Sequence, residues 1–202
     1  VCTYDFGSPC MILGKTQDFK SYERIEVVTQ PQNRGASLFP EKINGKYMKL
    51  DRPGGGSDCP GTIWLSTSPD LVHWGGFRPI LSVPSATWIS GKIGPTPPIR
   101  TEAGWLVIFH GTRTSASGMY YRIGAFLLDL EEPWKVLGVT KRPLLEPKED
   151  YELHGYCNDC VFPCGAIADH ERNELRLYYG AADTRVALAT ACLSDVVEAC
   201  LG

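Results

Sequence analysis

The stretch Ser37-Leu-Phe-Pro-Glu-Lys-Ile-Asn-Gly-Lys-Tyr-Met-Lys-Leu-Asp-Arg-Pro53 predicts two short strands joined by a tight turn. Asn44-Gly45 stands between the strands, and this dipeptide tolerates the positive φ angles that a two-residue hairpin turn requires. Polar and apolar residues alternate through the second strand, which ends on Arg52. The stretch is therefore expected to form a β-hairpin with an arginine at the end of its second strand.

The same hairpin pattern recurs twice further along the chain. The second copy runs from Pro97 to His110 with a turn through Ala103-Gly104, and the third runs from Phe162 to Gly180 with a turn around 171–173. Each copy is followed by a further apolar strand, at 62–66, 121–128 and 185–190. The repeating unit is therefore a group of three or more short strands.

An aspartate followed by an apolar residue marks the end of each unit, and an aromatic residue often stands close behind. The pairs are Asp18-Phe19, Asp70-Leu71, Asp129-Leu130 and, more weakly, Asp195-Val196. Repeats of this size built from short strands are typical of propeller blades. A β-sandwich also has many short strands joined by turns, but it has no reason to repeat a whole unit.

Helix-period patterns are nearly absent, and 21 Gly and 15 Pro interrupt the chain throughout. We therefore predict an all-β fold, with a short helix at 193–201, in a single propeller portion. The approximate blades are 1–30 (partial), 31–84, 85–147 and 148–202. Three and a half blades do not close a ring, and Val1–Phe6 matches the second strand of a blade. We expect the C-terminal portion of a longer protein, truncated at its N-terminus.

Composition narrows the expected partners. The 202 residues, 43% of them apolar, suffice for a core without division into separate domains. The net charge of −3 and the pI near 5.8 give no overall electrostatic support for a nucleic-acid surface. No run of 18 apolar residues exists, so a membrane span is not expected. Neither nucleic acid nor a membrane is therefore an expected partner.

Three of the eight cysteines lie close together. Cys157-Asn-Asp-Cys160, followed by Cys164, resembles a zinc or redox motif, and His154 is the only nearby candidate for a fourth ligand. Because the segment runs straight into an apolar strand, free thiols in a reducing compartment are the favoured interpretation. It predicts no metal site and a cytoplasmic location. The even count leaves disulfides open.

In a propeller the polar residues at the ends of inner strands converge on a central funnel, which is the usual ligand site. Aligning the three hairpins places Arg52 and His110 at equivalent strand ends, and Asp183 follows the corresponding Gly180. The other candidates that flank the hairpins or begin a following strand are Arg34, Lys92 and Tyr121. A single Arg or Lys is usually a solvated surface charge. Several cationic residues at corresponding positions instead predict an anion site, and phosphate suits Arg and Lys.

Five segments resemble glycoside hydrolase family 130: Leu38–Tyr47, Ser68–Trp74, Gly104–Gly111, Val161–Gly165 and Leu177–Thr184. Members of that family are five-bladed propellers, mostly β-mannoside phosphorylases with some β-mannosidases. The resemblance implies an inverting phosphorolysis of β-1,4-linked mannosides that releases α-mannose 1-phosphate. It implies a β-mannoside oligosaccharide and inorganic phosphate as partners, with phosphate as co-substrate and no cofactor.

The resemblance also assigns roles to the candidate residues. Arg34, Arg52, Lys92 and Tyr121 would bind phosphate with His110 close by, and Asp183 would contact hydroxyls of the mannosyl unit. An inverting hydrolase needs a base to activate water, whereas phosphate is already an anionic nucleophile that cations must hold in line.

One part of the family pattern is missing from this sequence. The proton donor of the family is an aspartate in a Glu-Asp-Pro-Arg string, and no such string occurs here. We therefore expect no catalytic residue in this chain and place the general acid upstream of Val1, because Asp5 does not match it. The fragment alone is expected to be inactive.

Two other functions stay open at this point. One is a hydrolytic β-mannosidase of the same family, and the other is a non-catalytic carbohydrate-binding propeller. Family hydrolases lack much of the basic set, so its presence favours the phosphorylase. The residues leave open the acceptor sugar and whether the protein forms a homo-oligomer.

Overall fold

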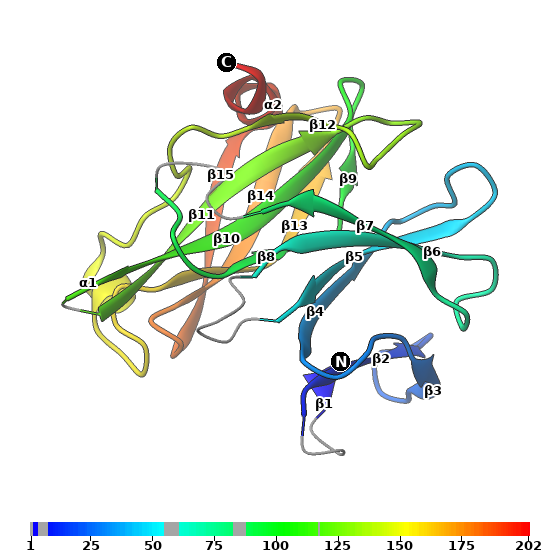
Figure 1. Ribbon diagram of the computed structural model, residues 1–202. Coiled ribbons are helices and arrows are strands. Elements are labelled where there is room, and N and C mark those ends of the chain that lie inside the picture. The colour runs from blue at the N-terminus through cyan, green and yellow to red at the C-terminus, as the bar shows by residue number, and fades with distance from the viewer. Residues whose placement is uncertain (1, 4–7, 55–60, 83–87, 117) are drawn as a thin grey trace.

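The computed structural model describes residues 2–3, 8–54, 61–82, 88–116 and 118–202, so Asp5 lies outside the described residues. Within them, four antiparallel sheets follow one another along the chain (Figure 1). The first sheet contains β1 (Cys2–Thr3), β2 (Cys10–Lys15) and β3 (Glu23–Val27). The second contains, in spatial order, β4 (Asn33–Leu38), β5 (Tyr47–Pro53), β6 (Ile63–Ser68) and β7 (Gly75–Leu81).

The third sheet is the longest, and its order is β12-β11-β10-β8 with β9 also paired to β10. Its strands are β8 (Ile93–Pro95), β9 (Ile99–Arg100), β10 (Trp105–Ser115), β11 (Gly118–Leu128) and β12 (Val136–Val139). The fourth contains β13 (Val161–Asp169), β14 (Glu174–Ala181) and β15 (Arg185–Cys192). Two helices, α1 (Asp150–Leu153) and α2 (Leu193–Leu201), complete the described elements, and α2 confirms the helix predicted at 193–201.

The predicted hairpin is formed by β4 and β5. Asn44 has φ 51° and Gly45 has φ 75°, the two consecutive positive values of a type I′ turn. Ile43 and Lys46 exchange backbone hydrogen bonds of 3.0 and 3.1 Å across it. The sequence prediction for this hairpin is confirmed, and Arg52 lies near the end of β5.

The two later hairpins are also present. β9 and β10 meet at Gly104, which has φ 150°, and β13 and β14 meet at Asn173, which has φ 52°. Sequence analysis missed β8, which pairs with β10 at Phe109–Gly111. This extra strand matters because it lies directly beside His110.

The repeated aspartates form one type of turn. In Asp18, Asp70 and Asp129, Oδ1 accepts the backbone N–H groups two and three residues further on, at 2.8 to 3.0 Å. The aspartate side chain thereby closes the turn after a strand. These backbone bonds lower the pKa of Asp18 to about 2, and they also lower the pKa of Asp70.

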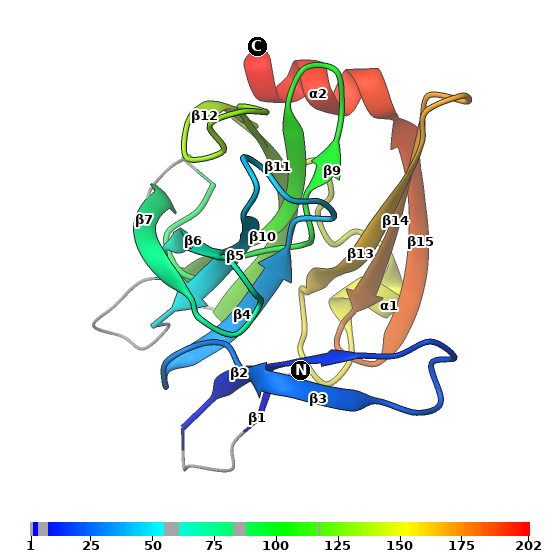
Figure 2. The same cartoon turned by 90° about the vertical axis from the view of Figure 1, so that its right-hand side faces the viewer.

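The third sheet is buried on both faces. Alternate residues of β10 point to opposite faces, so that Trp105, Val107 and Phe109 join one core and Leu106 and Ile108 join another. The first core is shared with the second sheet, and the other with the fourth sheet and α2. Figure 2 shows β10 and β11 between these two neighbours.

Successive antiparallel sheets packed face to face are the arrangement of neighbouring propeller blades. The prediction of an all-β fold that forms an incomplete propeller is confirmed. Within the described ranges, no helix is long and apolar enough to cross a membrane.

Candidate functional site

The centre of the candidate site is a contact between β5 and β10. Arg52 lies near the end of β5, as predicted, but β10 runs on to Ser115, so the prediction that His110 ends its strand is wrong. Nη1 of Arg52 on β5 lies 3.3 Å from Nε2 of His110 on β10. Guanidinium groups only donate, so Nε2 of His110 is the acceptor and the ring is neutral with its proton on Nδ1. Burial, and then the positive charges of Arg52 and Lys92, lower the pKa of His110 to about 3. The positive charge of the site therefore resides on Arg52 and Lys92.

The backbone of β8 fits closely beside His110. Gly94 pairs with His110, and a Cβ atom at Gly94 would lie 2.4 Å from Cε1 of the ring. Lys92, just before β8, is hydrogen-bonded to Thr112 of β10. The N–H of Lys92 donates to Oγ1 of Thr112 at 2.7 Å, and the N–H of Thr112 donates to the carbonyl of Lys92 at 2.8 Å. β8 thus confines the ring of His110, and Thr112 of β10 fixes the backbone of Lys92.

An aromatic surface completes the site. Phe162 of β13 stacks on His110 with ring centroids 4.5 Å apart and an angle of 34° between the planes. The ring of Tyr121 lies 5.8 Å from His110 and 6.4 Å from Phe162. Phe162 remains 40% exposed, so its ring is available to a ligand. Sequence analysis did not name Phe162 as a site residue, although its place at the start of the third hairpin was an available signal.

The charges of Arg52 and Asp183 both act on the hydroxyl of Tyr121. Burial is the main cause that raises the pKa of Tyr121; the neighbouring Cys157 and the charge of Asp183 raise it further, and Arg52 opposes them. Asp183 is exposed and lies in the turn after β14, with φ 57°. Two site residues of opposite charge therefore lie within electrostatic range of the Tyr121 hydroxyl.

Arg34 occupies a different kind of position. It is exposed on β4, the strand paired to β5. Its neighbour Gly35 lies against Arg52, because a Cβ atom at Gly35 would be 3.6 Å from Cβ of Arg52. The described contacts thus join Arg52, His110 and Tyr121, and the charges of Lys92 and Asp183 act on this group. Arg34 lies on the adjacent strand.

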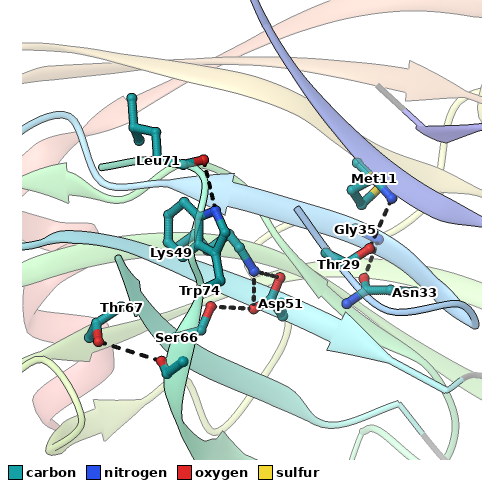
Figure 3. Close-up of polar contacts among 11 residues, drawn as sticks. Met11, Thr29, Asn33, Gly35, Lys49, Asp51, Ser66, Thr67, Leu71 and Trp74 are labelled. Carbon is teal, nitrogen blue, oxygen red and sulfur yellow. Dashed lines mark hydrogen bonds and ion pairs between the residues drawn. The ribbon is translucent and has the colours of Figure 1, made fainter. Parts of the chain in front are cut away.

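A buried ion pair lies on β5 just before Arg52 (Figure 3). Nζ of Lys49 is 2.5 Å from both carboxylate oxygens of Asp51, and Ser66 donates to the same carboxylate at 2.6 Å. Nζ of Lys49 also lies 4.6 Å from the ring centroid of Trp74. Burial lowers the pKa of Lys49 and raises that of Asp51. The alternation of β5 predicted a polar face here, and the structure buries that face.

Free thiols are found at Cys10, Cys157, Cys160, Cys164, Cys192 and Cys200. Burial, with Cys157 beside it, raises the pKa of Cys160. Across the described parts of the chain, no group of three or more His, Cys, Asp and Glu side chains is arranged to hold a metal ion.

Comparison with known proteins identifies the family. The family model for beta-1,4-mannooligosaccharide phosphorylase, glycoside hydrolase family 130, matches residues 2–201. The chain is 40% identical over 192 residues to a beta-1,4-mannooligosaccharide phosphorylase of Ruminococcus albus, covering 94% of this chain and 57% of that protein. It is 42% identical over 184 residues to a beta-1,2-mannobiose phosphorylase of Listeria innocua, covering 91% of this chain and 50% of that protein.

A solved structure agrees with these matches. The beta-1,2-mannobiose phosphorylase from Listeria innocua, in complex with beta-1,2-mannobiose, superimposes with a TM-score of 0.88 at 39% identity. The match covers 96% of this chain and 54% of that one, so the chain spans about half the length of the relatives it matches. The chain therefore belongs to glycoside hydrolase family 130.

Proposed function

We propose that the protein containing this chain is a β-mannoside phosphorylase, which cleaves β-linked mannosides with inorganic phosphate and releases α-mannose 1-phosphate. The observation that carries the proposal is the contact of Arg52 with a neutral, buried His110, on which the charge of Lys92 also acts. Arg52 and Lys92 supply the charge that phosphate requires. Because the ring of His110 accepts from Arg52 without adding charge, it orients the guanidinium toward its ligand.

In the proposed reaction the main task of these residues is to hold the phosphate in position. A phosphate oxygen forms a bond to the anomeric carbon while the bond from that carbon to the leaving sugar oxygen breaks, which inverts the anomeric centre. The leaving oxygen takes a proton from a general acid that the family resemblance places outside this chain. Arg52, Lys92 and Tyr121, with Arg34 on the adjacent strand, hold the nucleophile in line.

The mannosyl unit is assigned to the other side of the site. Asp183 is exposed and suited to accept hydrogen bonds from sugar hydroxyls. Phe162, on the sheet that carries Asp183, stacks on His110 and presents a partly exposed ring, and a sugar face packs well on such a ring. Cations at one side and a carboxylate with an aromatic ring at the other suit two chemically different substrates.

We retain the β-1,4 linkage as the specific proposal. A second candidate is the β-1,2 linkage, because relatives of nearly equal identity are named for each. Incubating the full-length protein with β-1,4- or β-1,2-mannobiose and phosphate distinguishes them. We expect α-mannose 1-phosphate from the β-1,4 disaccharide. Faster turnover of the β-1,2 disaccharide would reverse the linkage, and free mannose as the sole product would refute the phosphorylase.

A further inference from the structure

We propose that the buried pair of Glu152 and Tyr179 is a positioning device, which holds segment 154–160 against the backbones of Tyr121 and of Ala182, the residue before Asp183. For its catalytic consequence this inference rests on the proposed function. Glu152 and Tyr179 are positioning residues: they act on the candidate site through segment 154–160.

The pair itself is a closely satisfied carboxylate. Oη of Tyr179 donates to Oε1 of Glu152 at 2.6 Å, and the two side chains belong to residues only 4% and 2% exposed. Oε2 accepts the backbone N–H groups of Lys148 at 2.8 Å and Glu149 at 3.0 Å. Burial raises the pKa of Glu152, but the bonds from Tyr179 and the two amides outweigh it and leave the pKa lowered. Glu152 is thus held as an acceptor.

From Glu152 the bonding continues into the segment. The carbonyl of Glu152 accepts the N–H of Cys160 at 3.1 Å, and that of Leu153 accepts the N–H of Asp159 at 3.2 Å. These two bonds close residues 154–158 into a loop. α1 has only four residues, too few to be stable without tertiary support, so its place depends on what its side chains contact. Among the described hydrogen bonds, that of Tyr179 ties the α1 side chains to β14.

The segment then contacts, through the backbone, one candidate site residue and the neighbour of another. The carbonyl of Asp159 accepts the N–H of Tyr121 at 3.0 Å. Ala182, which precedes Asp183, donates to the carbonyl of Cys160 at 2.8 Å and accepts from the N–H of Cys157 at 3.1 Å.

The packing at the second contact is tight, because a Cβ atom on Gly155 would lie 2.5 Å from the carbonyl oxygen of Ala182. Ala182 and Asp183 both have positive φ, a strained conformation for residues with a side chain that surrounding structure must maintain. A displacement of the segment would therefore move Tyr121 and Asp183 together.

The experiment removes one hydroxyl from the full-length protein. Tyr179→Phe is compared with Tyr178→Phe, the same change one residue earlier, where the ring belongs to the opposite face of β14 and is 39% exposed. Hydrogen–deuterium exchange is followed in 154–160 and 181–184, with 47–53 of β5 as an internal reference. The KM for phosphate and kcat are measured on the same samples.

We expect Tyr179→Phe to raise exchange at least tenfold in both segments, leave 47–53 unchanged, and raise the KM for phosphate at least fivefold. Tyr178→Phe should change neither. Unchanged exchange at 181–184, a uniform rise across the protein, or local opening without any effect on KM or kcat would each overturn the inference. If the wild-type protein shows no phosphorolysis, the proposed function is refuted. Hydrogen–deuterium exchange requires no substrate, so it still decides whether the pair positions the segment.

If Tyr179→Phe does not fold, Glu152→Gln provides the second variant. Its amide keeps an acceptor for Tyr179, but it presents N–H donors to the two backbone amides that Oε2 now satisfies. The same two segments should open. When both variants fold, the double variant should show no more exchange than the worse single one, since both changes break one connection. Additive effects would contradict the inference.

Discussion

Arg52 and His110 meet at 3.3 Å although 58 residues separate them along the chain. Arg52 stands near the end of β5 and His110 at the middle of β10, the second strands of two hairpins that belong to successive sheets. The contact therefore arises from the repetition of one unit around the propeller. It also makes the histidine an acceptor, so that the neighbouring cations, not the imidazole, carry the charge.

A neutral His110 has a consequence for stability. Its folded pKa of about 3 lies below the ordinary value of 6.5, so between these values the unfolded state binds a proton that the folded state does not. The free energy of unfolding should fall as the pH drops below about 6.5, by up to about 1.4 kcal/mol per pH unit from this residue, and be unaffected above it. His110→Gln, which can still accept from Arg52, should lose this share of the slope. Denaturant titrations at pH 7 and pH 5 measure the free energy of unfolding of both proteins. An equal change between the two pH values in wild type and His110→Gln would refute the prediction.

The close fit of Gly94 against the imidazole makes that glycine sensitive to substitution. Gly94→Ala would place a methyl group 2.4 Å from Cε1 of His110, so either the ring or the strand must shift. We expect a loss of about 1–3 kcal/mol and a lower melting temperature. Gly75→Ala is the control, because nothing lies within 4 Å of its Cβ position. Equal melting temperatures for the two variants in thermal unfolding would show that the ring has room to adjust.

The ion pair of Lys49 and Asp51 is expected to be costly to break and less costly to replace. Lys49→Met leaves the buried carboxylate without its cation, which should cost about 3–5 kcal/mol. The double variant Lys49→Met, Asp51→Leu should recover a large part of the free energy of unfolding that Lys49→Met loses. Lys135→Met, at an exposed pair with Glu132, should leave the urea midpoint unchanged. A double variant as unstable as the single one would contradict this account.

Local chemistry explains which parts of the fold could be predicted from the sequence. Asn44-Gly45 is recognisable because its turn needs two positive φ angles. The pairs at Asp18, Asp70 and Asp129 are recognisable because each of these aspartates closes its own turn, whereas the weaker Asp195 pair lies in α2. The equivalence of Arg52 and His110 followed from aligning the hairpins. These features depend on neighbours in the sequence or on repetition, and both are visible without a structure.

The parts that escaped prediction depend on how sheets pack. Phe162 stands before a β-bulge between Pro163 and Gly165, so simple alternation along β13 does not tell that its ring faces His110. The bond between Glu152 and Tyr179 joins a four-residue helix to a strand, and neither carries a local signal of the other. Contacts of this kind become visible only once the third and fourth sheets are placed together.

The central claim is that Arg52 and its neighbours hold phosphate as the nucleophile. It is tested most directly by the initial rate of mannoside cleavage against phosphate concentration, in full-length wild type and Arg52→Ala. The control is Arg172→Ala, on the exposed turn between β13 and β14. The wild-type rate should saturate with phosphate and vanish without it. A charged hydrogen bond contributes about 1.5–3 kcal/mol, so Arg52→Ala should raise the KM for phosphate roughly ten- to a hundredfold, and Arg172→Ala should not. A rate independent of phosphate, or an Arg52→Ala enzyme with the wild-type KM, would contradict the account.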